Sequence, residues 1–217
     1  MDTVLFENRV DAAKQLAKQL KHYQETNSVV LGIPRGGVET AQVIAKELSL
    51  PMGLVVVRKI GHPYTKEYAI GAISESGAIV ENKEETKGLN PDWLKAESQN
   101  QLNEAKRRRI AYWKNRPLLN LEKKTAILVD DGLATGLTME VAIKELKKRN
   151  PAKIIVAVPV SPQDTAQRLK KEVDNFISLL TPQDYLGSVG AYYKKFSQIE
   201  DEEVIKMIND NPNETIP

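Results

Sequence analysis

The stretch VDDGLATGLT, Val129 to Thr138, decides the fold of this chain. It follows an apolar run that predicts a buried strand over residues 125–129, and it opens a predicted helix. Such loops, at the carboxyl ends of parallel strands, are where α/β proteins bind ligands. Gly132 and Gly136 permit tight turns, and the free N–H groups at the helix start complete a predicted phosphate cradle. The loop is neither a Walker loop nor the GxGxxG dinucleotide motif.

Asp130 and Asp131 form an acidic pair at the end of the predicted strand. Adjacent carboxylates repel each other and resist desolvation, so they need a partner: hydroxyl groups, a cation or a metal ion. The alternative interpretation is that Asp131 caps the turn or helix while Asp130 faces solvent.

Apolar runs and helical patterns alternate on both sides of this motif. Strands are predicted at residues 29–33, 53–57, 153–158 and 175–180, in addition to 125–129. Helices are predicted before the first strand, at 36–48, directly after the motif, and at about 163–172. Strands that are apolar on both faces and separated by single helices indicate an α/β fold with a mainly parallel sheet covered on both sides.

Two segments interrupt the alternation. Residues 69–80, centred on Glu75-Ser76-Gly77, predict a β-hairpin, and residues 92–116 predict a long, charge-rich helix. The run Arg107-Arg108-Arg109 in that helix is interpreted as a solvated face, with nucleic-acid contact as the alternative. We therefore predict one domain over residues 1–217, with an insertion at approximately 61–116.

Composition narrows the class of protein. The 217 residues carry a net charge of +2, too even for a dedicated nucleic-acid binder. The absence of cysteine excludes disulfides, thiol nucleophiles and cysteine–zinc sites, and the two histidines make a histidine triad improbable. The acidic start resembles no secretory signal, and no apolar run approaches the roughly 20 residues of a membrane span. The expectation is a cytoplasmic globular protein without membrane contact.

The residues AILVDDGLATGLT, 126–138, closely resemble the signature of type I phosphoribosyltransferases, which ends in Thr-Gly-x-Thr. One departure is Gly132, where the broad family usually has an aliphatic residue. The segments IPRGG (33–37), VRKIG (57–61) and the stretch from Pro182 through GSVGAYYKKF to Glu203 resemble a widespread branch known only as predicted phosphoribosyltransferases. The resemblance runs nearly end to end and implies that family's fold, with a hood.

The resemblance also implies roles for the residues. Asp130 and Asp131 would bind the ribose 2- and 3-hydroxyls of phosphoribosyl diphosphate and favour an oxocarbenium-like transition state. Pro34, Arg35, Gly36 and Gly37 would form the pyrophosphate loop, in which a strained peptide bond presents N–H groups to the leaving group. The alternative for Arg35 is a surface ion pair. The residues implied for the 5-phosphate are Gly132, Leu133, Ala134, Thr135, Gly136, Leu137 and Thr138.

Arg58 and Lys59 resemble a pair that neutralises pyrophosphate in adenine phosphoribosyltransferases. They are expected at the end of the second strand, with residues 61–68 forming a mobile loop that closes over the substrate. The expected catalytic set is therefore Asp130, Asp131, Arg35 and Lys59.

The acceptor is less defined. In 6-oxopurine salvage enzymes the fifth residue of the acidic-pair loop is an aspartate proposed to act as a base; here it is Ala134, so that mechanism is doubtful. Tyr185, Tyr192 and Tyr193 in the C-terminal segment could stack on a planar ring, although aromatic residues there can equally be core. Tyr185 is our guess for the acceptor contact.

The predicted reaction transfers 5-phosphoribosyl from its 1-diphosphate to an unidentified small acceptor, expected to be a nitrogen heterocycle of nucleoside metabolism, and releases pyrophosphate. Mg²⁺ bound with phosphoribosyl diphosphate is the expected cofactor, with no protein-only metal site. The alternative is a non-catalytic regulatory module that binds phosphoribosyl diphosphate. A third hypothesis is diphosphate transfer, as in the enzymes that make phosphoribosyl diphosphate. Nucleic acid is not an expected partner, and the resemblance suggests a homodimer.

Overall fold

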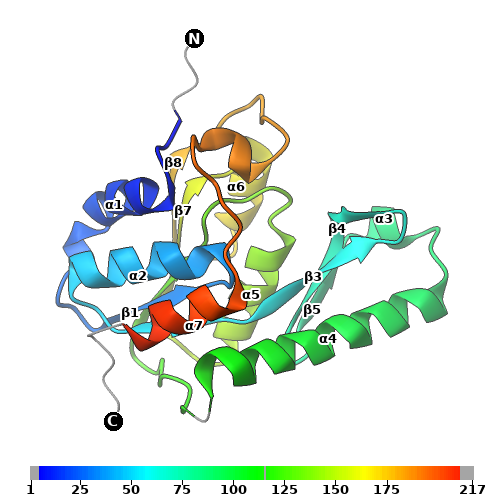
Figure 1. Cartoon of the computed structure of the whole chain (residues 1–217), viewed down its shortest axis with the longest axis horizontal. Coiled ribbons are helices and arrows are strands. Elements are labelled where there is room, and N and C mark those ends of the chain that lie inside the picture. The colour runs from blue at the N-terminus through cyan, green and yellow to red at the C-terminus, as the bar shows by residue number, and fades with distance from the viewer. Residues whose placement is uncertain (1–4, 115, 211–217) are drawn as a thin grey trace.

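The computed structural model describes residues 5–114 and 116–210 and has a parallel sheet at its centre (Figure 1). The five strands follow the order β2-β1-β6-β7-β8, and every neighbouring pair is parallel. The strands are β1 (Ser28–Gly32), β2 (Met52–Leu54), β6 (Thr125–Val129), β7 (Lys153–Val160) and β8 (Asn175–Leu180). The α/β fold with a mainly parallel central sheet is confirmed.

Helices cover both faces of this sheet because successive strand residues point to opposite sides. Val30 and Ile127 belong to the core beneath one group of helices, whereas Val29 and Ala126 belong to the core beneath the other. The first group is α1 (Arg9–Gln19), α2 (Gly36–Leu48) and α7 (Asp201–Asn209), and the second is α5 (Leu137–Lys147) and α6 (Gln163–Leu169). Short 3-10 turns follow α1 and β8, at Lys21–Tyr23 and Val189–Tyr192.

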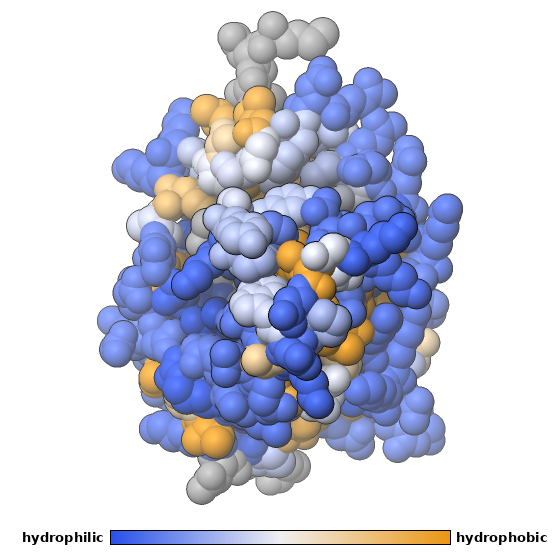
Figure 2. All heavy atoms as spheres, turned by 90° about the vertical axis from the view of Figure 1, so that its right-hand side faces the viewer, coloured by the Kyte–Doolittle hydropathy of each residue, from blue (hydrophilic) through white to orange (hydrophobic). Residues whose placement is uncertain are grey.

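A second, antiparallel sheet lies between β2 and β6 in the chain and extends from the side of the core (Figure 1). It consists of β3 (Val57–His62), β4 (Thr65–Ser74) and β5 (Ile79–Glu81), followed by α3 (Lys83–Thr86) and α4 (Pro91–Trp113). One face, with Ile60 and Ile70, packs against α4. The other face, with Val57 and Ala72, packs against α5. The outer end of this second sheet and α4, which faces the viewer in Figure 2, has a predominantly hydrophilic surface.

Three sequence predictions about this region were wrong in detail. The apolar run 53–57 is not one strand: β2 ends at Leu54, and β3 begins at Val57 in the other sheet. Both sheets bury both faces, so the two strands give the same apolar signal. Consequently Arg58 and Lys59 do not end the second core strand. Residues 61–68 are mostly the paired ends of β3 and β4, not a loop.

The arginine run in α4 is a solvated face only in part, because the side chain of Arg107 is 53% exposed whereas those of Arg108 and Arg109 are 12% and 19% exposed. Arg107 donates to Glu104 and to Asp201 at the start of α7, and Arg108 donates to Glu104. The guanidinium Nε of Arg109 lies 3.5 Å from Glu75 Oε1 in the β4–β5 turn. The ion pairs of Arg107 with Asp201 and of Arg109 with Glu75 attach α4 to α7 and to the β4–β5 turn. No helix among residues 5–114 and 116–210 combines the length and apolar character of a membrane span.

Glu75 should make stability depend on pH. Burial raises the pKa of its carboxyl to about 7, and the charge of Arg109 offsets this only in part. Between about 4.5, the ordinary pKa, and 7, folding takes up a proton, so this group's contribution to stability falls as pH rises. We expect Glu75→Gln to exceed the wild type in free energy of unfolding above pH 7, by on the order of 2–3 kcal/mol, and to match it near pH 4.

Denaturant titrations across this pH range measure the difference. Glu81→Gln, an exposed carboxyl on the neighbouring strand β5, is the matched control and should show no such dependence. An unchanged difference between wild type and Glu75→Gln at all pH values would contradict the assignment.

Candidate functional site

The acidic pair lies where β6 ends, in contact with the first residues of α2. The backbone N–H of Asp131 donates to Asp130 Oδ1 at 2.9 Å. A Cβ atom on Gly36 would lie 1.8 Å from Asp131 Oδ2, and one on Gly37 would lie 2.9 Å from Asp130 Oδ1. Only glycine allows this approach, so the structure brings the predicted ribose and pyrophosphate residues together.

Arg9, at the start of α1, is the partner that the acidic pair requires, and the sequence analysis missed it. Its Nε donates to Asp131 Oδ2 at 2.7 Å, and its Nη1 donates to the carbonyl oxygen of Ser197 at 2.8 Å. The guanidinium carbon lies 3.8 Å from the centre of the Phe196 ring. Arg9 is only 6% exposed, and the side chain of Asp131 is 14% exposed, so this ion pair is largely buried.

Burial dominates the ionisation of the pair. It raises the pKa of Asp130 well above its ordinary value, and the neighbouring Asp131 charge adds to that increase. Burial also raises the pKa of Asp131, against the opposing charge and hydrogen bond of Arg9. Arg9 therefore favours an ionised Asp131, and the pair is best described as one coupled acid.

The loop Gly132–Thr138 connects this pair to α5. Gly136 has φ +74° and lies directly before α5, so the free N–H groups of the helix begin at the loop. Two residues of α6 hold the loop from outside: Thr165 Oγ1 donates to the carbonyl oxygen of Ala134 at 3.1 Å, and Arg168 Nη2 donates to that of Thr135 at 2.6 Å. Neither was predicted from the sequence.

Packing explains why residue 132 is glycine where the broad family usually has an aliphatic residue. An added Cβ atom there would lie 2.5 Å from Val189 Cγ1 and 3.0 Å from Val160 Cγ1. The space that an aliphatic side chain would need is therefore filled by Val189, from the C-terminal segment.

Arg35 lies directly before α2, and the Pro34–Arg35 peptide bond is cis. Its Nη1 donates to Glu200 Oε2 at 3.0 Å and lies 3.9 Å from Asp201 Oδ1. The ion pair considered as an alternative is thus present, and it joins Arg35 to the start of α7.

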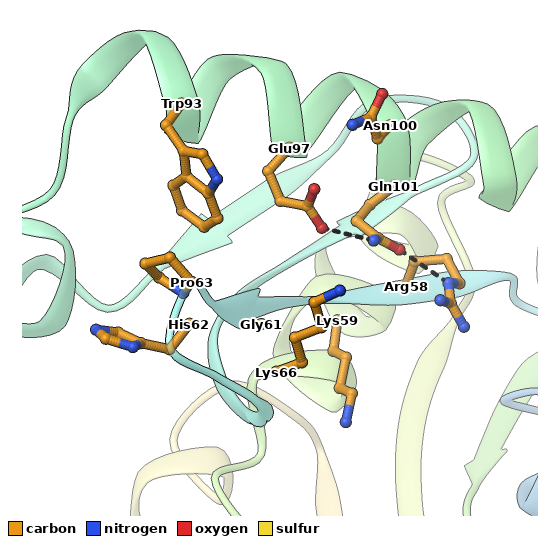
Figure 3. Close-up of a pocket in the computed structure, with 10 residues that line it drawn as sticks. All are labelled: Arg58, Lys59, Gly61, His62, Pro63, Lys66, Trp93, Glu97, Asn100 and Gln101. Atoms are coloured by element: carbon orange, nitrogen blue, oxygen red, sulfur yellow. Dashed lines mark hydrogen bonds between the residues drawn. The ribbon is translucent and has the colours of Figure 1, made fainter.

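Arg58 and Lys59 occupy opposite faces of β3, as neighbours on a strand must. Arg58 Nε donates to Gln101 Oε1 of α4 at 3.1 Å, whereas the Lys59 side chain extends away from α4 (Figure 3). Arg58 and Lys59 therefore do not form one joint binding site for pyrophosphate.

Tyr185 is half-buried and stacks on Tyr192, with ring centres 5.4 Å apart. Its hydroxyl has no hydrogen-bond partner within the described part of the chain, and burial raises its pKa to about 12. Tyr192 and Tyr193 are core residues, and the Tyr193 hydroxyl donates to the carbonyl oxygen of Asp131 at 2.5 Å. The acceptor role of Tyr185 stays a prediction.

An acidic pair and a helix start at the carboxyl ends of parallel strands are the arrangement at which α/β proteins commonly bind ligands. The sequence pattern of the family described as "Phosphoribosyl transferase domain" matches residues 4–194, and the chain belongs to this family.

Two relatives agree with this membership. The chain is 37% identical over 207 residues to a Mycobacterium tuberculosis (strain CDC 1551 / Oshkosh) protein named "Putative phosphoribosyl transferase", covering 94% of this chain but 46% of that protein. The crystal structure of TT1426 from Thermus thermophilus is 34% identical, with a TM-score of 0.77, covering 95% of this chain and 99% of that one.

Proposed function

We propose that this protein transfers the 5-phosphoribosyl group of phosphoribosyl diphosphate to a ring nitrogen of a small heterocycle. The nitrogen lone pair forms the new bond to ribose C1, and the C1–oxygen bond breaks with its electron pair leaving on pyrophosphate. A proton on the acceptor nitrogen passes to water. The observation that carries this proposal is the position of Asp130 and Asp131, which contact the two glycines that begin α2 and directly precede the loop that opens α5.

Each loop has a task suited to its chemistry. The carboxylates of Asp130 and Asp131 would accept hydrogen bonds from the ribose hydroxyls and stabilise positive charge that develops at C1. The N–H groups at the start of α5, with Thr135 and Thr138, would bind the 5-phosphate. Arg35 and the amides of Gly36 and Gly37 would bind the leaving pyrophosphate.

Mg²⁺ fits this site as a shared ligand. Residues 5–114 and 116–210 contain no group of three or more acidic, histidine or cysteine residues that could hold a metal ion alone. Hard divalent cations commonly combine one or two carboxylates with substrate phosphates, and Asp130 and Asp131 are carboxylates of that kind. The ion would neutralise charge on the diphosphate as it leaves.

A screen of heterocycles with phosphoribosyl diphosphate and Mg²⁺, measuring pyrophosphate release, tests the proposal. Acceptor-dependent release is the expected result. Binding of phosphoribosyl diphosphate without release by any acceptor would favour the alternative, a regulatory module. No binding at all would contradict both.

Arg35→Ala should weaken pyrophosphate binding by about 1.5–3 kcal/mol, the size of a hydrogen bond to a charged group. Glu200→Gln should strengthen it, because Glu200 competes for the same guanidinium. Calorimetric titration with pyrophosphate and Mg²⁺ measures both effects. Lys46→Ala, at the far end of α2, is the control and should bind as the wild type does. Equal affinity for all variants would remove Arg35 from the site.

A further inference from the structure

A cavity of about 600 Å³ lies between the β3–β4 hairpin and α4 (Figure 3). This size is within the range of small-molecule sites. None of the α4 residues that line it was predicted as functional from the sequence. The cavity belongs to the segment between β2 and β6, outside the core sheet.

The α4 side of the cavity presents a planar ring and amide groups. Trp93, Glu97, Asn100 and Gln101 recur at the spacing of one helix face, and all four line the cavity. An indole offers a stacking surface for a flat ligand, and an amide can both donate to and accept from the edge of a ring. Trp93, Glu97 and Gln101 extend from α4 toward the hairpin (Figure 3).

The hairpin side is basic. Arg58 and Lys66 present their charges to the cavity, against one carboxylate among the lining residues, that of Glu97, whereas the charge of Lys59 lies on the other side of β3. Gln101 links the two sides, because its Nε2 donates to Glu97 Oε1 at 2.8 Å and its Oε1 accepts from Arg58. Burial, and after it the charge of Arg108, lowers the pKa of Arg58, so its charge is costly in this position. An anion bound nearby would offset part of that cost.

We propose that this cavity binds a planar heterocycle that carries a carboxylate. The ring stacks on Trp93, and its carboxylate faces Lys66, which lies between Trp93 and Arg58 (Figure 3). Resting on the proposed function, this ligand is the phosphoribosyl acceptor, and the acceptor site lies at α4 instead of at Tyr185. The strand β3, which carries Arg58, packs against α5, the helix that begins directly after the acidic-pair loop.

Matched pairs of probes test the class of ligand. Nicotinate and nicotinamide share a ring and differ in the negative charge, as do orotate and uracil. Calorimetric titration, with and without phosphoribosyl diphosphate and Mg²⁺, should show at least one carboxylate binding about tenfold or more tightly than its neutral partner. If neither carboxylate is preferred under either condition, the proposal is overturned.

Tryptophan fluorescence localises the binding. The two tryptophans are Trp93, half-buried at the cavity, and Trp113, 5% exposed in the core, so a bound ring should quench Trp93. Trp93→Phe should remove the quenching and weaken binding. Lys66→Gln should weaken carboxylate binding by about threefold or more, whereas its control Lys87→Gln, exposed after α3, should not. Full binding by Trp93→Phe, or equal quenching by inorganic pyrophosphate, would overturn the proposal.

These results separate the cavity from the reaction. Asp130→Asn should keep carboxylate binding in the cavity, measured without phosphoribosyl diphosphate or as the quenching of Trp93. Carboxylate binding in a protein that never releases pyrophosphate would overturn the acceptor assignment and the transferase together. Pyrophosphate release with acceptors that do not quench Trp93 would overturn only the cavity.

Discussion

Asp130→Asn will reduce phosphoribosyl transfer, measured as kcat/KM for phosphoribosyl diphosphate, by about a hundredfold or more. The change removes the negative charge beside ribose C1 and one carboxylate acceptor for the ribose hydroxyls. Two charge-assisted hydrogen bonds at about 1.5–3 kcal/mol each are enough for a loss of this size. The amide oxygen of Asn can still accept from the N–H of Asp131, so the local backbone is preserved.

The same variant should not lose stability, which distinguishes it from a folding defect. The pKa of Asp130 is raised in the folded state, so at neutral pH its ionisation opposes folding, and this cost decreases as pH falls toward the ordinary carboxyl pKa. Asp130→Asn should therefore melt at or above the wild-type temperature near pH 7. Asp92→Asn, exposed in the first turn of α4, is the control for both measurements. Wild-type turnover by Asp130→Asn would exclude the ribose assignment.

Arg9→Met should lower the free energy of unfolding by about 3–5 kcal/mol, the cost of breaking a buried ion pair by removing one partner. The Asp131 carboxylate then remains buried without its closest cation. Phosphoribosyl diphosphate should also bind more weakly, because Arg9 fixes the orientation of that carboxylate. Denaturant titration and calorimetry measure the two effects.

Arg9→Met combined with Asp131→Asn should recover part of the lost stability, because no charge is then left unpaired, but it should not recover ligand binding. Arg107→Met is the matched control: its side chain is 53% exposed, and surface ion pairs are worth about 0–1 kcal/mol. If Arg9→Met and Arg107→Met unfold at the same denaturant concentration, Arg9 is not a structural partner of the acidic pair.

The core sheet could be predicted from the sequence because buried parallel strands produce continuous apolar runs. The signature at 126–138 also placed the acidic pair at a strand end. Where the same apolar signal serves two sheets, as at residues 53–57, the boundary between β2 and β3 is invisible to periodicity. The contacts that complete the site were beyond the sequence, because Arg9 and Asp131 are separated by 122 positions.

One signal for Arg9 was available. It lies on the same face of α1 as Ala13, Leu16 and Leu20, and all four are buried. A charge on the apolar stripe of a helix is costly unless it is paired, and this could have prompted the search for a buried acid. The cavity at α4 offered no comparable signal, because its lining residues are polar and depend on how the hairpin folds over the helix.

The contact between Gly132 and Val189 has a consequence for how sequences of such proteins vary. A larger residue at 132 needs a different loop backbone, because Gly132 has φ +156°, and it also needs smaller neighbours at positions 189 and 160. In an alignment, a chain with an aliphatic residue after its acidic pair should therefore differ at the position of Val189 as well. Variation at position 132 of the signature should thus be linked to variation at position 189, which lies 57 residues further along the chain.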